Sequence, residues 1–253
     1  MDLPVVPAGS GAHPIPLVVI AANRLAESTA FYTTVFGWQA TPMTSELTAM
    51  TMSSGPAVTL RANVPDGFPG VVPYITVPNV PDALARVTAA GAGVERAPWT
   101  IPGIGAMARF KDQSGTIYGL TDSTALGALP HVPMPFGKNP KPPVSTLCSL
   151  EMYAADGGAA AQFFGAQFGW GSLATMAHYM AFDAGAGIGG VFQSHTPAMP
   201  ALVYVYVADV SATLTAIEAA GGKRMGDAMP MPGMGCFGYF TDVSGTAMGL
   251  IGP

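Results

Sequence analysis

The chain has little charge and almost no cysteine. Only 10% of its 253 residues are charged, the formal net charge is -5, and Cys148 and Cys236 are its two cysteines. Without a basic stretch to neutralise a phosphate backbone, nucleic acid is not an expected partner. The two cysteines form no C-x-x-C pattern, so a disulfide framework is not expected. The fold must therefore depend on an apolar core, for which the 49% hydrophobic residues are sufficient.

Long hydrophobic runs are also missing. The run PLVVIAA at 16–22 is far shorter than the roughly 20 residues that cross a membrane, so we expect no membrane partner. The N-terminal MDLPVVPAGSGAHP lacks the basic start and apolar core of a signal peptide, which predicts a cytoplasmic protein.

The sequence does contain a long internal repeat. FKDQSGTIYGL at 110–120 returns as FTDVSGTAMGL at 240–250, and FYTTVFGW at 31–38 returns as FFGAQFGW at 163–170. Because the matches keep the same order, they predict two modules. We place the modules at 1–122 and 147–253, with a proline-rich linker at 123–146 that favours an extended connection.

Each module divides again into two similar halves. A short apolar strand, at 17–21 or 149–153, leads into a helical stretch that ends at FGW. Gly37 and Gly169 suit the left-handed residue that follows a helix. Short strands come next, and the second half repeats the plan. This order predicts an α+β fold.

The repeated D-x-S-G sequence is typical of a tight hairpin. Asp112 and Asp242 can accept backbone hydrogen bonds, and the glycine of each motif can take positive φ without steric cost. We therefore interpret both aspartates as turn formers rather than catalysts.

Four strand-helix-strand-strand-strand units, with FYxxxFGW after the first helix and DxSG before the last strand, resemble the vicinal oxygen chelate superfamily. This superfamily includes glyoxalase I, extradiol dioxygenases and bleomycin-resistance proteins, and the tandem layout is similar to two-module glyoxalase-like proteins of actinobacteria. The resemblance implies four βαβββ units forming cup-shaped mixed sheets, each cup able to hold a ligand. It also implies a pseudo-dimer within one chain, existing as a monomer or weak homodimer.

In metal-using members of this superfamily, four side chains in the first, fourth, fifth and eighth strands hold a divalent ion. The corresponding positions, taken from both modules, are Leu17, Thr59, Val72, Gly119, Ser149, Gly190, Leu202 and Gly249. None is a histidine or a carboxylate, the donors that such ions require. The histidines at 13, 131, 178 and 195 are scattered without metal-binding spacing. We therefore expect no metal and no other cofactor.

Strand alternation predicts which residues point into a cup. Ser149, Glu151 and Tyr153 share one face of an apolar strand. A buried carboxylate is costly unless it is paired, and burial raises its pKa toward the range of a general acid or base. Glu151 is the first catalytic candidate, with Tyr153 and His178 as helpers. The alternatives are a salt bridge, for example to Arg109, or an outward-facing side chain.

Ligand contacts are expected from aromatic, methionine and small polar residues on neighbouring strands and rims. Methionine adapts to a broad apolar ligand, and tyrosine offers a flat wall with a hydroxyl at its tip. Filling of an ordinary core would use the same residues. The candidates are Met50, Met52, Tyr74, Trp99, Ser149, Met180, Phe182, Tyr204 and Tyr206.

Three functions remain open at this point. The first is a metal-independent, non-redox acid/base reaction of the lyase, isomerase or cyclase type on an apolar, aromatic or polyketide-like small molecule. The second is sequestration of a drug or metabolite, as in bleomycin-resistance proteins. The third, a metal-dependent glyoxalase or dioxygenase, is opposed by the missing donors. We favour the enzyme because Glu151 has Val19 as its counterpart in the first module, a difference that two equal binding cups would not need.

Overall fold

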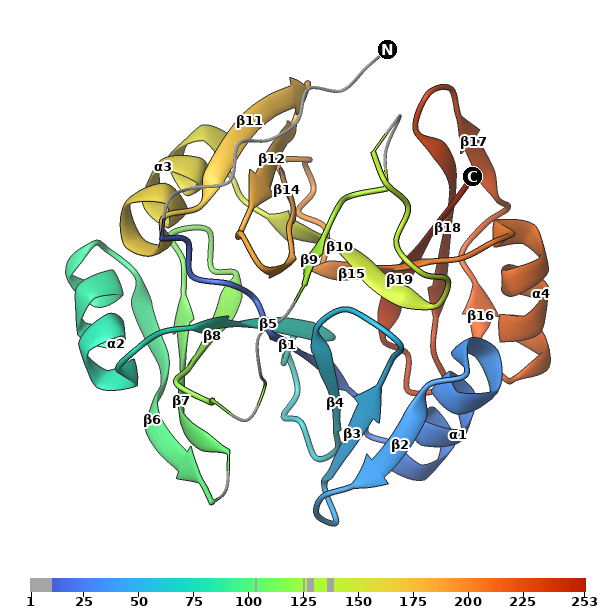
Figure 1. The fold of residues 1–253 in the computed structure, drawn as a ribbon, viewed down its shortest axis with the longest axis horizontal. Coiled ribbons are helices and arrows are strands. Elements are labelled where there is room, and N and C mark those ends of the chain that lie inside the picture. The colour runs from blue at the N-terminus through green and yellow to red at the C-terminus, as the bar shows by residue number, and fades with distance from the viewer. Residues whose placement is uncertain (1–10, 103, 125, 127–129, 136–138) are drawn as a thin grey trace.

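The computed structural model describes residues 11–102, 104–124, 126, 130–135 and 139–253 (Figure 1). Two large mixed sheets, one from each module, stand side by side with helices on their outer flanks. The α+β class and the two tandem modules expected from the repeat are present.

The first sheet has eight strands and an internal pseudo-twofold arrangement. In sheet order the strands are β2 (Gln39–Pro42), β3 (Leu47–Thr51), β4 (Ala57–Arg61), β1 (Leu17–Ala21), β5 (Val71–Thr76), β8 (Ile117–Thr121), β7 (Gly105–Lys111) and β6 (Gly93–Ile101). β1 pairs parallel with β4, β5 pairs parallel with β8, and the two halves meet where β1 and β5 run antiparallel. One cup is therefore built from both units of the same module.

The second sheet repeats this plan. Its order is β11 (Gly171–Met176), β12 (Tyr179–Asp183), β14 (Gly190–Gln193), β10 (Thr146–Tyr153), β15 (Leu202–Tyr206), β19 (Ala247–Gly252), β18 (Gly235–Thr241) and β16 (Lys223–Arg224), with β17 (Met229–Met231) also paired to β18. Glu151 pairs with Val191 and Leu202, just as Val19 pairs with Thr59 and Val72 in the first sheet.

Four helices are present within the described residues, and side chains cap the start of three of them. They are α1 (Leu25–Phe36), α2 (Val80–Ala89), α3 (Gly157–Phe168) and α4 (Val210–Ala219). Asp156 caps α3 by accepting hydrogen bonds from the backbone N–H groups of Gly158 and Ala159. Helices α1 and α3 end at Gly37 and Gly169, whose φ angles of 71° and 69° confirm the predicted left-handed residues.

The repeated motifs meet across the interface between the modules. Helix α1 of module one packs beside α4, and α3 of module two lies beside α2 (Figure 1). The Thr246 hydroxyl donates to the carbonyl of Ala21, and that of Thr116 donates to the carbonyl of Tyr153, both over 2.7 Å. Each D-x-S-G hairpin therefore forms a hydrogen bond to the backbone of the other module.

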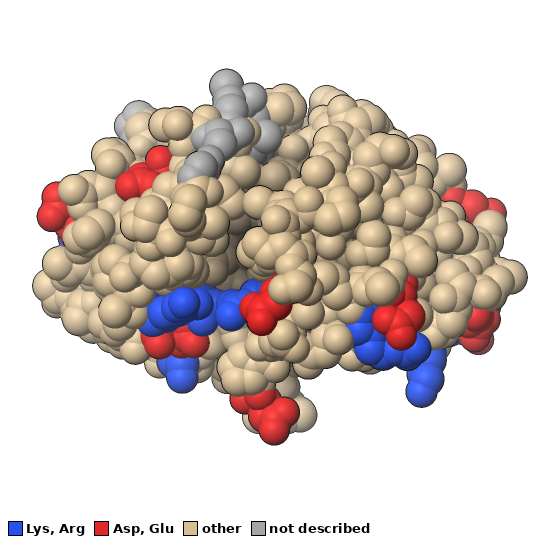
Figure 2. All heavy atoms as spheres, turned by 90° about the horizontal axis from the view of Figure 1, so that it is seen from below, with Lys and Arg blue, Asp and Glu red and all other residues tan. Residues whose placement is uncertain are grey.

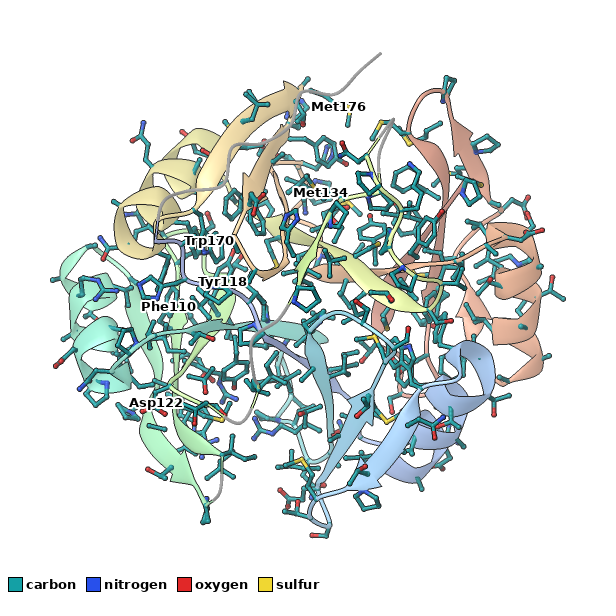
Figure 3. The ribbon with its side chains drawn as sticks, in the orientation of Figure 1. Phe110, Tyr118, Asp122, Met134, Trp170 and Met176 are labelled. Atoms are coloured by element: carbon teal, nitrogen blue, oxygen red, sulfur yellow. The ribbon has the colours of Figure 1, made fainter. Side chains whose placement is uncertain are left out.

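Aromatic side chains fill this interface. The Tyr118 ring lies 4.7 Å from the ring of Phe164, which stacks on Trp170 at 4.7 Å. Figure 3 shows Phe110, Tyr118 and Trp170 close together where the two modules join. Burial of several large rings contributes strongly to the core, so the expected packing as a pseudo-dimer has a clear physical cause.

The segment 123–146 does more than connect the modules. Its strand β9 (His131–Val132) pairs in parallel with β13 (Gly187–Ile188) of module two. The described residues 130–135 and 139–140 thereby lie against the second cup, while part of the expected linker is outside the described residues.

Among the described residues, none of the helices is long and apolar enough to cross a membrane.

Candidate functional site

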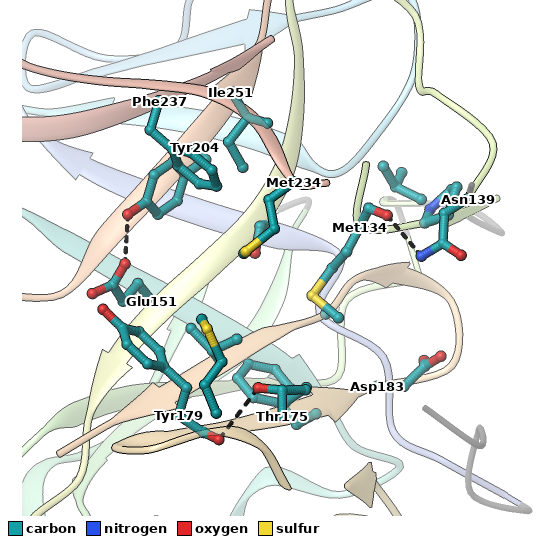
Figure 4. A pocket seen from close by; sticks show the side chains of 18 of the residues that line it. Met134, Asn139, Glu151, Thr175, Tyr179, Asp183, Tyr204, Met234, Phe237 and Ile251 are labelled. Carbon is teal, nitrogen blue, oxygen red and sulfur yellow. Dashed lines mark hydrogen bonds between the residues drawn. The ribbon is translucent and has the colours of Figure 1, made fainter. Parts of the chain in front are cut away.

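The concave face of the second sheet encloses a cavity of about 700 Å³ (Figure 4). Its wall is formed by β10, β12, β14, β15, β18 and β19, and the linker residues close one side. A volume of this size is typical of sites for drug-sized ligands. The cavity is the candidate functional site.

One end of the cavity carries a buried carboxylate and two phenols. Glu151 is 5% exposed, and its Oε2 accepts a hydrogen bond of 2.5 Å from the Tyr204 hydroxyl. The Tyr204 and Tyr239 hydroxyls are 3.2 Å apart. Because a hydroxyl has one proton, Tyr239 donates to Tyr204 when Tyr204 donates to an ionised Glu151. When Glu151 is protonated, both bonds can reverse, so the three groups form a chain along which protons can shift.

The electrostatic surroundings favour proton exchange at Glu151. Burial raises the pKa of Glu151 above its usual value, and this is opposed by the hydrogen bond from Tyr204 and by His195. Burial and the negative charge of Glu151 raise the pKa of Tyr179 to about 12. Figure 4 shows the Tyr179 hydroxyl pointing toward the Glu151 carboxylate. At neutral pH the phenols therefore remain proton donors around the carboxylate.

The remaining wall is mostly apolar. Met134 from the linker and Met234 from the loop before β18 project into the same space as Phe237 and Ile251 (Figure 4). Such side chains suit an apolar ligand because methionine adapts its shape and the aromatic ring adds contact area. A second polar group lies at the rim, where His131 Nε2 is 3.2 Å from Asp183 Oδ2.

The structure brings part of the predicted site together. Ser149, Glu151 and Tyr204 line this cavity, and Phe182 borders it while its ring stacks on Trp170 in the main core. Tyr74 and Trp99 lie in the other cup, where Tyr74 is 2% exposed and both pack in the apolar cluster of module one.

The predicted alternation on β12 is wrong by one residue. His178 is exposed and lies in the turn before the strand with φ of 67°, so the strand begins only at Tyr179. Tyr179, Ala181 and Asp183 line the cavity, whereas Met180 packs against the main core beside α3. The predicted set therefore lies on the core face of β12, and the exposed His178 is not placed to assist Glu151.

Four further candidates lie outside the cavity. Met50 is 1% exposed in the main core, Met52 packs against that core, and Tyr206 is buried within it. Tyr153 ends β10 at the interface between the modules, where its carbonyl accepts the Thr116 hydrogen bond. These side chains fill or border the core because strand alternation alone does not say which face of a sheet is covered by helices.

Tyr179, Tyr239 and the linker residues were not among the sequence candidates. Tyr239 shares a face of β18 with Phe237, and it pairs with Gly249 next to Tyr204. The repeat aligns Tyr239 with Arg109, which the sequence analysis names only as an ion-pair alternative for Glu151. The linker residues follow no periodic pattern, so their contribution to the cavity left no signal in the sequence.

The residues of the cups do not fit the divalent ion of the superfamily. The Tyr204 ring covers Gly249, where a Cβ atom would lie 2.3 Å from a ring carbon, and Tyr74 covers Gly119 in the same way at 2.2 Å. The fourth-strand position of module two is Val191 by strand pairing, rather than Gly190. Within the described part of the chain, no three His, Cys, Asp or Glu residues lie together as a metal site.

Comparisons with known proteins agree with this architecture. Residues 15–117 match the family model of the Glyoxalase/Bleomycin resistance protein/Dioxygenase superfamily. The chain is 27% identical over 239 residues to proteins named "Putative glyoxylase CFP32" from Mycobacterium bovis and Mycobacterium tuberculosis, covering 88% of each chain.

Similar folds are found among solved structures. The Mn(II)-bound glyoxalase from Novosphingobium aromaticivorans aligns with a TM-score of 0.64 at 14% identity, over 97% of this chain and 83% of that one. The 2,3-dioxygenase LapB from Pseudomonas sp. KL28 aligns equally well, over 98% and 94%. Residues 15–117 therefore resemble the Glyoxalase/Bleomycin resistance/Dioxygenase superfamily, module two repeats the architecture of module one, and the chain as a whole shares the fold of these solved structures.

Proposed function

We propose that the protein is a metal-independent acid/base enzyme of the lyase, isomerase or cyclase type, acting on an apolar small molecule in the cavity of module two. The observation that carries this proposal is the hydrogen-bonded chain Tyr239–Tyr204–Glu151 at the end of an otherwise apolar cavity. A buried carboxylate held by phenols is suited to accept a proton and to return it elsewhere on the substrate.

Each group has a defined role in such a reaction. Ionised Glu151 accepts a proton from an acidic C–H or O–H group, and its raised pKa makes it a stronger base than an exposed glutamate. Tyr179 donates a hydrogen bond to an oxygen on which negative charge develops. Protonated Glu151 then returns the proton to another atom of the substrate, or to a departing group. No oxidant is required.

The cavity wall restricts the substrate class. The apolar surface of Met134, Met234 and Phe237 favours a flat, largely apolar molecule, such as an aromatic or polyketide-like compound. The substrate must also bring an ionisable position close to Glu151.

A binding protein is the second candidate, and the methionine-lined wall favours it. Sequestration would use the same apolar contacts but would not require proton transfer at Glu151. A metal-dependent glyoxalase or dioxygenase reaction is opposed because aromatic rings cover the eighth-strand positions of both modules.

Glu151→Gln distinguishes these functions. Apolar aromatic compounds that displace Nile red from the wild type would first be incubated with the protein, and products followed by mass spectrometry. For a general base, Glu151→Gln lowers turnover roughly 10²-fold or more while affinity changes little, because the amide keeps the shape but not the basicity. Glu218→Gln, at an exposed glutamate of α4, serves as the matched control. Tight binding without any product, unchanged by Glu151→Gln, would indicate a binding protein.

A further inference from the structure

The cup of module one carries positive charge where that of module two carries an acid. In module one, Tyr74 and Arg109 both pair with Gly119 of the last strand. In module two, Tyr204 and Tyr239 both pair with Gly249. Tyr74 is therefore the counterpart of Tyr204, and Arg109 is the counterpart of Tyr239. Glu151 is replaced by Val19. The two cups therefore offer opposite chemistry to a ligand.

Arg109 is a buried cation with one unused donor. It is 4% exposed, and its Nε and Nη2 donate to the Glu95 carboxylate over 2.5 and 3.3 Å. Its Nη1 is also buried and has no partner that meets hydrogen-bond geometry, although the Tyr74 hydroxyl is close enough to interact with the guanidinium group. Leaving a charged donor unpaired inside a protein is costly, so an acceptor supplied by a ligand would be strongly favoured.

Two more guanidinium groups, of Arg61 and Arg96, lie near two aromatic rings that Arg109 also approaches. Arg61 and Arg109 lie 5.4 and 5.0 Å from the centre of the Phe68 ring. Arg96 lies 4.0 Å from the centre of the Trp99 ring, which Arg109 also approaches at 5.5 Å. These five residues form the cationic–aromatic cluster.

Carboxylates within the described residues do not balance this charge. Glu95 pairs with Arg109, but neither Arg61 nor Arg96 has an ion-pair partner there. Glu46 is the other carboxylate that acts on Arg61, and it accepts a hydrogen bond from Asn63 instead. Burial and repulsion from Arg109 and Arg96 lower the pKa of Arg61, so the cluster carries excess positive charge.

We propose that the cup of module one is a second ligand site, which binds an organic monoanion: a carboxylate attached to a flat apolar group. The carboxylate lies among Arg61, Arg96 and Arg109, because planar guanidinium groups match its two oxygens. The flat group packs on Trp99 and Phe68.

The outer surface is compatible with entry of such a molecule. Figure 2 views the module-one side of the protein and shows a recess at the centre of this face, with Lys or Arg atoms beside Asp or Glu atoms at its rim. Arg96 is exposed, and Arg61, Phe68 and Trp99 are only partly buried. A small anion can therefore approach the cluster from solvent.

This site is independent of the proposed reaction. None of the residues in the cationic–aromatic cluster lines the cavity of module two. An inactive Glu151 variant would leave this proposal intact, and loss of the anion site would leave the acid/base proposal intact.

Benzoate is the probe for the test, and Trp99 is the reporter. Trp38 and Trp170 are 1% and 4% exposed in the core, so Trp99 is the tryptophan that a ligand at the cationic–aromatic cluster would contact. We expect benzoate to change tryptophan emission, and Trp99→Phe to abolish the change. Binding should weaken as salt increases, and neutral benzamide should not bind detectably.

The double variant Arg61→Gln/Arg96→Gln should weaken benzoate binding about tenfold or more, since two charge-assisted contacts are lost. Arg24→Gln, at an exposed arginine paired with Glu27, and Glu151→Gln should bind benzoate as the wild type does. The proposal is overturned if benzoate produces no change that depends on Trp99. It is equally overturned if the double variant binds benzoate with unchanged affinity.

Discussion

The Tyr32 hydroxyl in α1 of module one donates a 3.0 Å hydrogen bond to Oδ2 of Asp242 in the last hairpin of module two. At the corresponding interface, between α3 and the hairpin of module one, Phe164 stands in place of Tyr32. There the hydroxyl belongs to Tyr118 of β8, whose counterpart in module two is Met248. The Tyr118 hydroxyl is buried without a partner. The two interfaces thus have the same shape but different polar contacts.

This difference predicts opposite effects of removing the two hydroxyls. Tyr32→Phe should lower the free energy of unfolding by about 1 to 3 kcal/mol, because it removes a buried hydrogen bond to a carboxylate. Tyr118→Phe should be neutral or stabilising, because it removes an unsatisfied buried hydroxyl. Urea denaturation of both variants measures the effects, and an equal loss in the two would contradict this account of the interface.

The D-x-S-G hairpins should make stability depend on pH. Burial raises the pKa of Asp112 to about 6, although backbone N–H groups of Thr116 and Ser114 oppose the shift. Between about pH 4 and 6 the folded state therefore binds more protons than the unfolded state, and stability falls as pH rises through this window. Asp112→Asn keeps an oxygen that accepts the backbone bonds but cannot ionise.

Thermal melting at a series of pH values tests this prediction. The melting temperature of Asp112→Asn should fall less steeply than that of the wild type between about pH 4 and 6. Asp66→Asn, at an exposed carboxylate, should keep the wild-type slope. A slope for Asp112→Asn identical to that of the wild type would show that Asp112 does not titrate in this range.

The glycines under the tyrosine rings should not tolerate a side chain. Gly249→Ala places a Cβ atom 2.3 Å from the Tyr204 ring, so we expect a loss of about 1 to 3 kcal/mol from overpacking. Gly93→Ala, at a strand glycine with no atom within 4 Å of the added Cβ, is the control and should be nearly neutral. In a Tyr204→Ala background the cost of Gly249→Ala should largely disappear, and an undiminished cost there would rule out the ring as its cause.

Much of the fold could be predicted because the same motifs occur in both halves of the sequence. The paired motifs placed the modules, Gly37 and Gly169 marked two helix ends, and Asp112 and Asp242 accept the backbone bonds expected of turn formers. These features depend on local backbone chemistry. The contacts of α1 and α3 with the hairpin of the other module join residues that are distant in sequence, and no local pattern encodes them.

The site was less predictable, for three physical reasons. Alternation places Glu151 and Tyr204 on the cup face, but on β12 it selects Met180, which packs against the core, instead of Tyr179 and Ala181, which line the cavity. Alternation also gives no information about which face a helix covers, so it assigns the core residue Met50 to a cup. The contribution of Met134 from the linker depends on the pairing of β9, which two residues of sequence cannot indicate.

The hydrogen-bonded chain at Glu151 makes a prediction that does not require knowledge of the substrate. The Tyr204 hydroxyl donates to the ionised carboxylate and thereby lowers a pKa that burial raises. Tyr204→Phe should raise the pKa of Glu151 further, because a hydrogen bond that stabilises the charged form is lost. Tyr239→Phe should have a smaller effect in the same direction, since Tyr239 acts through Tyr204.

Infrared difference spectra recorded during a pH titration would follow the protonated carboxyl group of Glu151, and Glu151→Gln would identify its band. Tyr206→Phe is the matched control, because Tyr206 is buried on the same strand but does not line the cavity. Tyr206→Phe should leave the titration unchanged, so a shift confined to Tyr204→Phe and Tyr239→Phe would reflect the hydrogen bonds rather than general loosening of the sheet. If Tyr204→Phe left the titration of Glu151 where it is in the wild type, the phenol would not be tuning this carboxylate. The three groups could then not act as one proton-transferring unit.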